Sequence, residues 1–121
     1  MSIYDATGTP PSSLLGPNPN WYEFSVDPNG THKINVNLSK NCDVNVAVFS
    51  TNPPNSTITT LNDLSLLGEN TASENSVTVS FSTSIADQTI YLAISSQTET
   101  ITASDVCINL NGNAASFSFV T

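Results

Sequence analysis

Hydrophobic and polar positions alternate with a period of two along most of this chain. In residues 32–38, for example, every second side chain after His32 is aliphatic and the others are Lys or Asn. Because successive side chains of a β-strand point to opposite faces, this alternation predicts half-buried strands. Strands are predicted over residues 21–26, 32–38, 42–50, 76–82, 89–95, 101–110 and 116–120, with a break near Ala103 and Ser104.

Turn-forming residues separate the predicted strands. Residues 27–30 read Asp-Pro-Asn-Gly, which favours a tight turn, so the strands on either side are predicted to pair as a hairpin. Pro53 and Pro54 follow the strand at residues 42–50 and end it, since proline has no backbone donor for a strand ladder. Residues 58–68 contain four leucines that fit a short helical turn or a bulged strand equally well, and we treat them as a connection.

The predicted elements amount to seven or eight short strands, without a long amphipathic helix. At 121 residues the chain has the length of one domain. We therefore expect an all-β fold, a single antiparallel and jelly-roll-like β-sandwich over residues 21–121. Residues 1–20 contain four prolines and two glycines, and they predict an extended N-terminal arm.

The charge balance narrows the range of partners. The chain has two Lys, no Arg and a formal net charge of −8. Nucleic acids and anionic membranes are bound largely through Lys and Arg, so neither is an expected partner. No segment approaches the length of about eighteen apolar residues that a membrane span needs, and the N-terminus lacks the pattern of a signal peptide.

Charged residues are also scarce on the predicted strands. They make up 10% of the chain, against about 25% in typical soluble proteins, and Ser, Thr and Asn take the polar strand positions instead. The strand edges therefore lack the charges that normally prevent pairing between molecules. This composition favours a subunit of an assembly or a secreted adhesin.

No group of residues has the pattern of a catalytic site. His32 is the single histidine, no G-x-S-x-G sequence accompanies it, and we expect a solvated residue beside a turn. The ten carboxylates lie mostly in turns, and no spacing selects a pair for glycoside hydrolysis. We therefore expect that the protein is not an enzyme and that it has no catalytic, cofactor-binding or metal-binding residues.

Calcium binding stays an open alternative, because Asp27 with Asn29, and Asp43 with Asn45, place oxygen ligands two residues apart.

The two cysteines are predicted to lie on opposite faces of their strands. Cys42 shares a face with the inward valines of its strand, whereas Cys107 alternates with Val106 and Ile108, which we assign to the core. Two independent thiols are therefore favoured. A β-bulge would reverse one of these faces, so a disulfide stays open as an alternative.

Several apolar and aromatic residues outside the inferred core are candidates for an interface. Trp21 and Tyr91 fall on the strand faces opposite the core, and we expect them to be exposed. There they would form a protein contact or an edge cap, or act with Tyr4 as a stacking platform for sugars. The candidate interface residues are Ile3, Tyr4, Leu14, Leu15, Trp21 and Tyr91.

Three stretches resemble one known family. They are Trp-Tyr-Glu-Phe-Ser-Val at residues 21–26, Asn-Cys-Asp-Val-Asn-Val-Ala-Val at residues 41–48, and Thr-Ile-Tyr-Leu-Ala-Ile at residues 89–94. Over residues 21–110 the chain resembles the bacterial pre-peptidase C-terminal (PPC) domain family, in which an aromatic strand precedes a strand that opens with an acidic residue. The resemblance implies a jelly-roll-like sandwich and a non-catalytic appendage that binds surfaces or carbohydrate.

Two functional hypotheses remain. The first is a non-catalytic structural protein that docks on neighbouring subunits through its arm and strand faces, as a capsid decoration or cement protein does on a virion surface. Its partners would be further copies of the chain or a capsid protein. The alternative is a secreted carbohydrate- or surface-binding module of the PPC type, with or without Ca²⁺. The arm, the weakly charged strands and the lack of a catalytic pattern favour the first.

Overall fold

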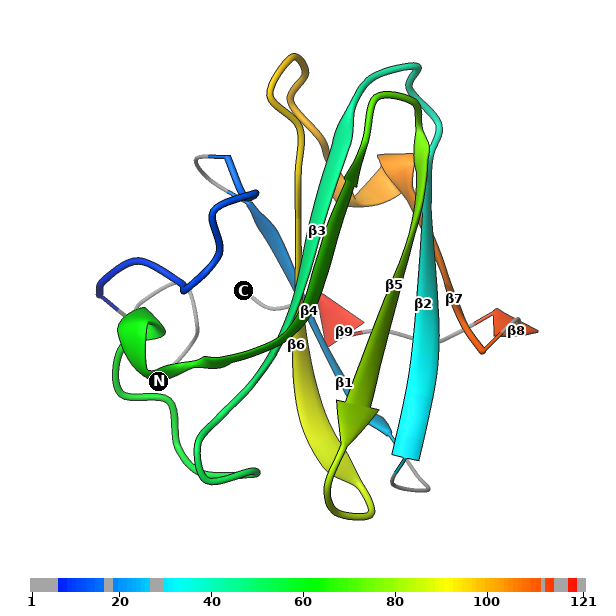
Figure 1. The fold of residues 1–121 in the computed structure, drawn as a ribbon. Coiled ribbons are helices and arrows are strands. Elements are labelled where there is room, and N and C mark those ends of the chain that lie inside the picture. Colours follow the sequence, from blue (N-terminus) through cyan, green and yellow to red (C-terminus); the bar gives the residue numbers. More distant parts are fainter. Residues whose placement is uncertain (1–6, 17–18, 27–29, 112, 115–117, 120–121) are drawn as a thin grey trace.

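Two antiparallel sheets packed face to face form the protein (Figure 1). This is a computed structural model, and it describes residues 7–16, 19–26, 30–111, 113–114 and 118–119. The five-stranded sheet has the order β4 (Ser65–Ala72), β3 (Val44–Ser50), β6 (Gln88–Ser95), β1 (Asn20–Val26) and β9 (Ser118–Phe119). The four-stranded sheet has the order β5 (Ser76–Thr83), β2 (Gly30–Leu38), β7 (Val106–Leu110) and β8 (Asn113–Ala114). The predicted all-β antiparallel sandwich is confirmed.

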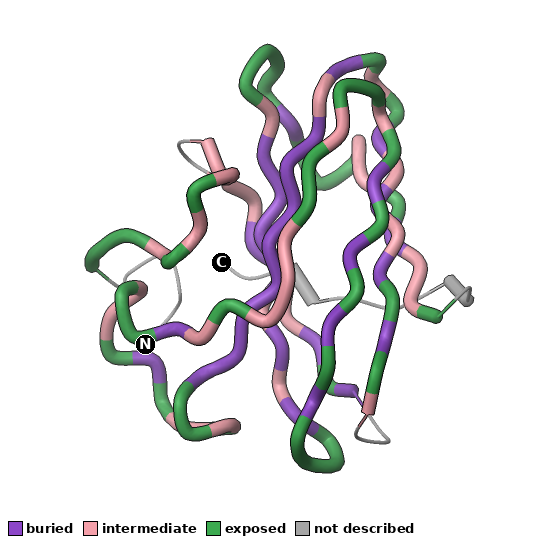
Figure 2. Tube along the Cα trace, in the orientation of Figure 1, coloured by how far each residue is buried: buried purple, intermediate pink, exposed green. Residues whose placement is uncertain are grey.

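The main core lies between the two sheets and follows the predicted alternation. On β5, for example, each apolar side chain is buried and each hydroxyl side chain between them is exposed, as the alternating colours of Figure 2 show. The inward side chains of the other long strands behave in the same way. The fully buried members include Ile34, Val36, Val44, Val46, Val48, Ile90, Leu92 and Ile94.

The predicted hairpin between the first two strands is wrong. β1 pairs with β6 and β9, whereas β2 pairs with β5 and β7, so the two strands lie in opposite sheets. The alternation identified the inward face of each strand correctly. A period of two carries no information about which strand is the neighbour, and here the connection crosses from one sheet to the other.

Part of the segment that we treated as a connection is a strand. Residues 58–68 contain the short 3₁₀ helix η1 (Leu61–Asp63) and the start of β4, which pairs with β3 along its length. The register shifts between Val48 and Phe49, opposite the adjacent leucines Leu66 and Leu67. This irregularity breaks the period-two signal and explains why the sequence left the segment ambiguous. The predicted break near Ala103 is a second 3₁₀ helix, η2 (Ala103–Asp105).

The edges of the two sheets protect each other on one side of the sandwich. β4 and β5 are edge strands of different sheets, and the side-chain amide of Asn70 donates to the backbone oxygen of Thr78 at 3.0 Å. Gly68 allows the close approach, because a Cβ at that position would lie 2.4 Å from the backbone oxygen of Ser80. On the other side, the edge strands β8 and β9 have two residues each. Edge strands that are covered by a neighbour or are very short offer little surface for pairing with a strand of another molecule. They limit such pairing without charged side chains, which are scarce in this sequence.

Candidate functional site

A second apolar cluster lies on the outer face of the five-stranded sheet. This outer cluster consists of Trp21, Ala47, Phe49, Ile58, Leu64 and Ala93. The rings of Trp21 and Phe49 are 5.7 Å apart between centroids. Because the outer cluster covers the face away from the main core, β3 is buried on both of its faces, as its continuous burial in Figure 2 shows.

The chain itself covers this outer face. The segment of residues 7–16, which we call the arm segment, and the loop of residues 51–64 lie together beside the five-stranded sheet (Figure 1). Thr7 forms a parallel bridge with Thr60, and the backbone amide of Leu61 donates to the Thr7 oxygen at 2.9 Å. The amide of Thr9 donates to Oδ1 of Asn62 at 3.3 Å. The start of the arm segment is thus held by η1 and the residue before it.

The later part of the arm segment contacts strands of the sheet. The Ser12 hydroxyl donates to the Glu69 carboxylate of β4 at 2.5 Å, and the Gly16 amide donates to the Ser95 hydroxyl of β6 at 3.0 Å. Between them, the Leu15 side chain packs against the outer cluster. One apolar anchor and a few hydrogen bonds therefore hold this irregular segment against the sheet.

The candidate interface residues have different environments in the structure. Trp21 and Tyr91 do lie on the face opposite the main core, as predicted, but the expected exposure of Trp21 is wrong because only 3% of it is accessible. Tyr91 is half-buried, as are Leu14 and Leu15. Ile3 and Tyr4 lie outside the described residues. The structure thus brings Leu15, Trp21 and Tyr91 together, whereas their part in an intermolecular interface stays a prediction.

Tyr91 lies opposite Glu23 in the pairing of β1 with β6. Partial burial raises the pKa of the Tyr91 hydroxyl, and the negative charge of Glu23 raises it further. The hydroxyl is therefore a neutral hydrogen-bond donor throughout the physiological pH range. A neutral phenol beside a carboxylate is suited to binding polar groups rather than to nucleophilic chemistry.

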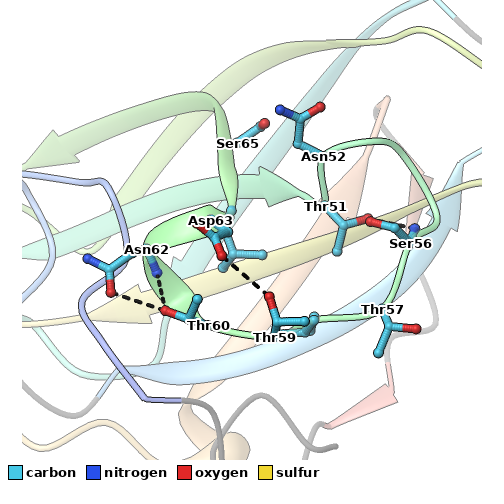
Figure 3. Close-up of a pocket in the computed structure, with 11 residues that line it drawn as sticks. Thr51, Asn52, Ser56, Thr57, Thr59, Thr60, Asn62, Asp63 and Ser65 are labelled. Carbon is cyan, nitrogen blue, oxygen red and sulfur yellow. Dashed lines mark hydrogen bonds between the residues drawn. The ribbon is translucent and has the colours of Figure 1, made fainter.

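The loop between β3 and β4 forms a polar cavity of about 440 Å³ (Figure 3). Its lining consists of Thr51, Asn52, Ser56, Thr57, Ile58, Thr59, Thr60, Asn62, Asp63, Leu64 and Ser65. Sequence reasoning overlooked this site, because residues 52–55 were interpreted as the end of a strand and residues 58–68 as a connection. A signal was available in the density of Thr, Ser and Asn between residues 51 and 65.

His32 is buried, so the expectation of a solvated turn residue is wrong. Only 4% of it is accessible, its ring lies 5.4 Å from that of Phe81, and Nε2 is 3.3 Å from the Thr83 hydroxyl. Its Nδ1 lies 3.1 Å from the side-chain nitrogen of Asn111. The period-two pattern of β2 already placed His32 on the same face as Ile34, and that signal outweighs the proximity of the turn.

Asp43 and Asn45, the described pair of calcium candidates, do not share a ligand site. The Asp43 carboxylate accepts hydrogen bonds from the hydroxyls of Ser96 and Thr98, each at 2.6 Å, and from the amide of Gln97 at 2.9 Å. Oδ1 of Asn45 instead accepts from the Thr71 hydroxyl at 2.6 Å. Asp43 therefore anchors the loop after β6, while Asn45 faces β4. The other pair, at residues 27 and 29, lies outside the described residues.

The hydrogen bonds to Asp43 predict a pH-dependent stability. The Ser96 and Thr98 hydroxyls are the main causes that hold the pKa of this carboxyl well below its ordinary value of 3.8. Its stabilising effect is therefore complete above pH 3.8 and is lost as the pH falls toward the lower pKa of the folded state. We expect Asp43→Asn to lower the free energy of unfolding at neutral pH by about 1–2 kcal/mol, and this difference to shrink in acid. Urea denaturation at several pH values measures it.

Asp87→Asn is the matched control for that substitution. Asp87 is exposed in the turn before β6 and has a positive φ of 52°, which Asn also adopts readily. It should change stability by less than about 0.5 kcal/mol. An Asp43→Asn variant as stable as this control at neutral pH would contradict the anchoring role of Asp43.

The cysteines lie as the alternation predicts. Cys42 is buried, Cys107 is exposed, and both thiols are free.

Within the described residues, no three His, Cys, Asp or Glu side chains gather as a metal site, and no helix is long and apolar enough to cross a membrane.

Comparison with known proteins yields no relative. The sequence matches no protein family, and neither a curated protein nor a solved structure matches it. The resemblance to the PPC family therefore stays a prediction. The proposed function rests on the fold and on the geometry of the outer face.

Proposed function

We propose that this protein is a non-catalytic structural subunit that assembles by docking its N-terminal arm and its strand faces on neighbouring subunits. The observation that carries the proposal is the outer cluster, which is closed by the β3–β4 loop and by Leu15 of the arm segment rather than by a third layer of structure. A protein whose apolar outer face is complementary to its own arm segment can accept the same segment from another copy.

The contacts of the arm segment support such an exchange. The Leu15 anchor, the bridge of Thr7 with Thr60 and the bond from Ser12 to Glu69 all depend on side chains and backbone that every copy presents. An exchanged arm therefore forms the same interactions between two molecules as within one. In the sequence, Pro17 and Pro19 separate the arm segment from β1. Prolines favour an extended connection, which is suited to reaching a neighbour.

The outer face of the four-stranded sheet supplies a second surface for contact. Its β5 side chains are exposed hydroxyls, and those of β2 include the amides of Asn35 and Asn37. Hydrogen bonds link the two strands, for example from the Asn35 amide to the Thr78 hydroxyl at 3.1 Å. Neutral polar groups are buried in an interface at a lower desolvation penalty than charges. This favours a broad and weakly charged contact.

A virion surface is the setting that we propose for this assembly, with the protein as a decoration or cement subunit on a capsid. A shell of repeated subunits offers the identical neighbours that arm docking requires. The support is the combination of the arm, the weakly charged strand faces and the acidic net charge of −8, which disfavours contact with nucleic acid. Capsid genes beside the coding sequence would agree with this setting, and hydrolase genes would argue for a secreted module.

Cross-linking between two differently substituted chains tests the docking. One chain carries Ser12→Cys and the other carries Glu69→Cys, both in a Cys107→Ser background, and one of them has a tag so that mixed dimers differ in mass. Because the native side chains are in contact, a short bis-maleimide should join the mixed chains if arms dock between molecules. We expect a mixed dimer whose yield rises with protein concentration, measured on denaturing gels.

A second mixture controls for random collisions. Here Ser12→Cys is combined with Ser104→Cys, since Ser104 is exposed on η2, outside the strand faces that we propose for docking. Its yield of mixed dimer should be far lower. Equal yields in the two mixtures, together with a monomer in light scattering at every concentration, would contradict the proposed assembly.

A further inference from the structure

We propose that the loop between β3 and β4 binds a neutral carbohydrate, a monosaccharide or a short oligosaccharide, in the cavity of Figure 3. The cavity shares Thr60 and Asn62 with the contacts of the arm segment, but the proposal does not depend on arm docking between molecules. The cavity volume of about 440 Å³ lies within the range of small-ligand pockets, about 300–1,000 Å³.

The lining has hydrogen-bonding groups that the protein leaves available. The side chains of Asn52, Thr57 and Ser65 form no hydrogen bond within the described part of the chain, and all three line the cavity. Together they offer an amide and two hydroxyls, which donate as well as accept. A ligand covered with hydroxyl groups matches this mixture, because each sugar hydroxyl also donates and accepts.

Asp63 supplies the charged anchor of the site. Its Oδ2 accepts a hydrogen bond from the Thr59 hydroxyl at 3.3 Å, as Figure 3 shows, while Oδ1 has no partner among the described residues. A carboxylate at the wall of a cavity accepts hydrogen bonds from adjacent sugar hydroxyls, and charge-assisted bonds of this kind are strong. The other described lining residues are uncharged. The Asp63 carboxylate would therefore repel an anionic ligand, and no positive charge in the described lining would offset that repulsion.

The loop is held in shape before any ligand arrives. Ile58 and Leu64 are buried in the outer cluster and fasten the loop to the sheet. Within the loop, the Ser56 amide donates to the Thr51 hydroxyl at 3.0 Å, and the Asn62 amide donates to the Thr60 hydroxyl at 3.1 Å. A preorganised site loses less conformational entropy on binding, which favours even a small polar ligand.

Titration with neutral sugars, followed by amide chemical shifts, tests the site. The probes are D-glucose, D-galactose, D-mannose and N-acetyl-D-glucosamine at millimolar concentrations. We expect at least one of them to shift the amides of Asn52, Thr57 and Ser65 in a saturable way. Glucose 6-phosphate should bind more weakly than glucose, because its negative charge meets Asp63.

Two pairs of variants separate the site from the rest of the surface. Asp63→Asn should weaken the best probe by about tenfold or more, and Ser65→Ala by several-fold. Their matched controls, Glu74→Gln and Ser80→Ala, change exposed residues outside the cavity and should leave the affinity unchanged. Amide spectra of all four variants establish that the fold is intact.

Three outcomes would overturn the assignment. They are the absence of saturable shifts with every neutral sugar, equal loss of affinity in the cavity variants and their controls, and tighter binding of glucose 6-phosphate than of glucose. The last result would mean that an anion rather than a sugar is recognised. None of these outcomes bears on arm docking, which is measured separately by cross-linking.

Discussion

Replacing Trp21 with Ala is expected to lower the free energy of unfolding by about 3–5 kcal/mol. Trp21 is 3% exposed and is the largest side chain of the outer cluster, where it packs beside Phe49. Its removal would leave a cavity under the arm segment and would expose Ile58 and Leu64, the apolar residues of the β3–β4 loop that pack in the outer cluster. Because single domains are stable by only about 5–15 kcal/mol, this loss would be a large part of the total.

Urea denaturation followed by circular dichroism measures this effect without relying on the tryptophan. Leu66→Ala is a suitable control, since Leu66 is an apolar residue of β4 that is 37% exposed. It should lower stability by less than about 1 kcal/mol. Equal effects of the two substitutions would mean that Trp21 is exposed in solution, as the sequence alone suggests, and that the outer cluster does not form.

The second large effect is expected for Gly68→Ala, which should destabilise the protein by about 1–3 kcal/mol. The added Cβ would lie 2.4 Å from the backbone oxygen of Ser80 and 3.1 Å from a methyl group of Val79. A backbone atom cannot move aside without shifting β5, so β4 and β5 would have to separate. Thermal or urea unfolding measures the loss.

Gly16→Ala is the matched control, because neither glycine has a left-handed φ. At Gly16 the nearest atom to an added Cβ is the side-chain nitrogen of Gln97 at 3.3 Å, and this flexible side chain can rotate away. Its effect should stay within about 0.5 kcal/mol. If Gly68→Ala were equally mild, the close approach of β4 and β5 would not exist in solution.

The facing of residues was predictable because it depends on local geometry. Alternation correctly placed Tyr22, Ile34 and Ile108 toward the main core, and it separated buried Cys42 from exposed Cys107. Each of these statements needs only the geometry of an extended strand, in which every second side chain shares a face. The same rule, applied without exception, would also have placed His32 inside.

Strand partners and the second face of the five-stranded sheet were not predictable in this way. The turn sequence at residues 27–30 suggested a hairpin, yet β1 and β2 lie in different sheets. Trp21 was assigned correctly to the outer face but wrongly to the solvent, because the arm segment and the β3–β4 loop cover it. The cavity was overlooked although its lining lies within residues 51–65, because the density of polar residues there does not show how the loop folds around η1.

The sequence by itself determined that this chain forms strands with one apolar face each and that these faces pack together as a two-layer sandwich. That follows from a period of two, which is a property of neighbouring residues. Only the tertiary structure decided the strand order, the burial of Trp21 beneath the arm segment and the gathering of polar groups around Asp63. These features join residues far apart in the chain or depend on the packing of one element on another, and no local pattern encodes which distant segments meet.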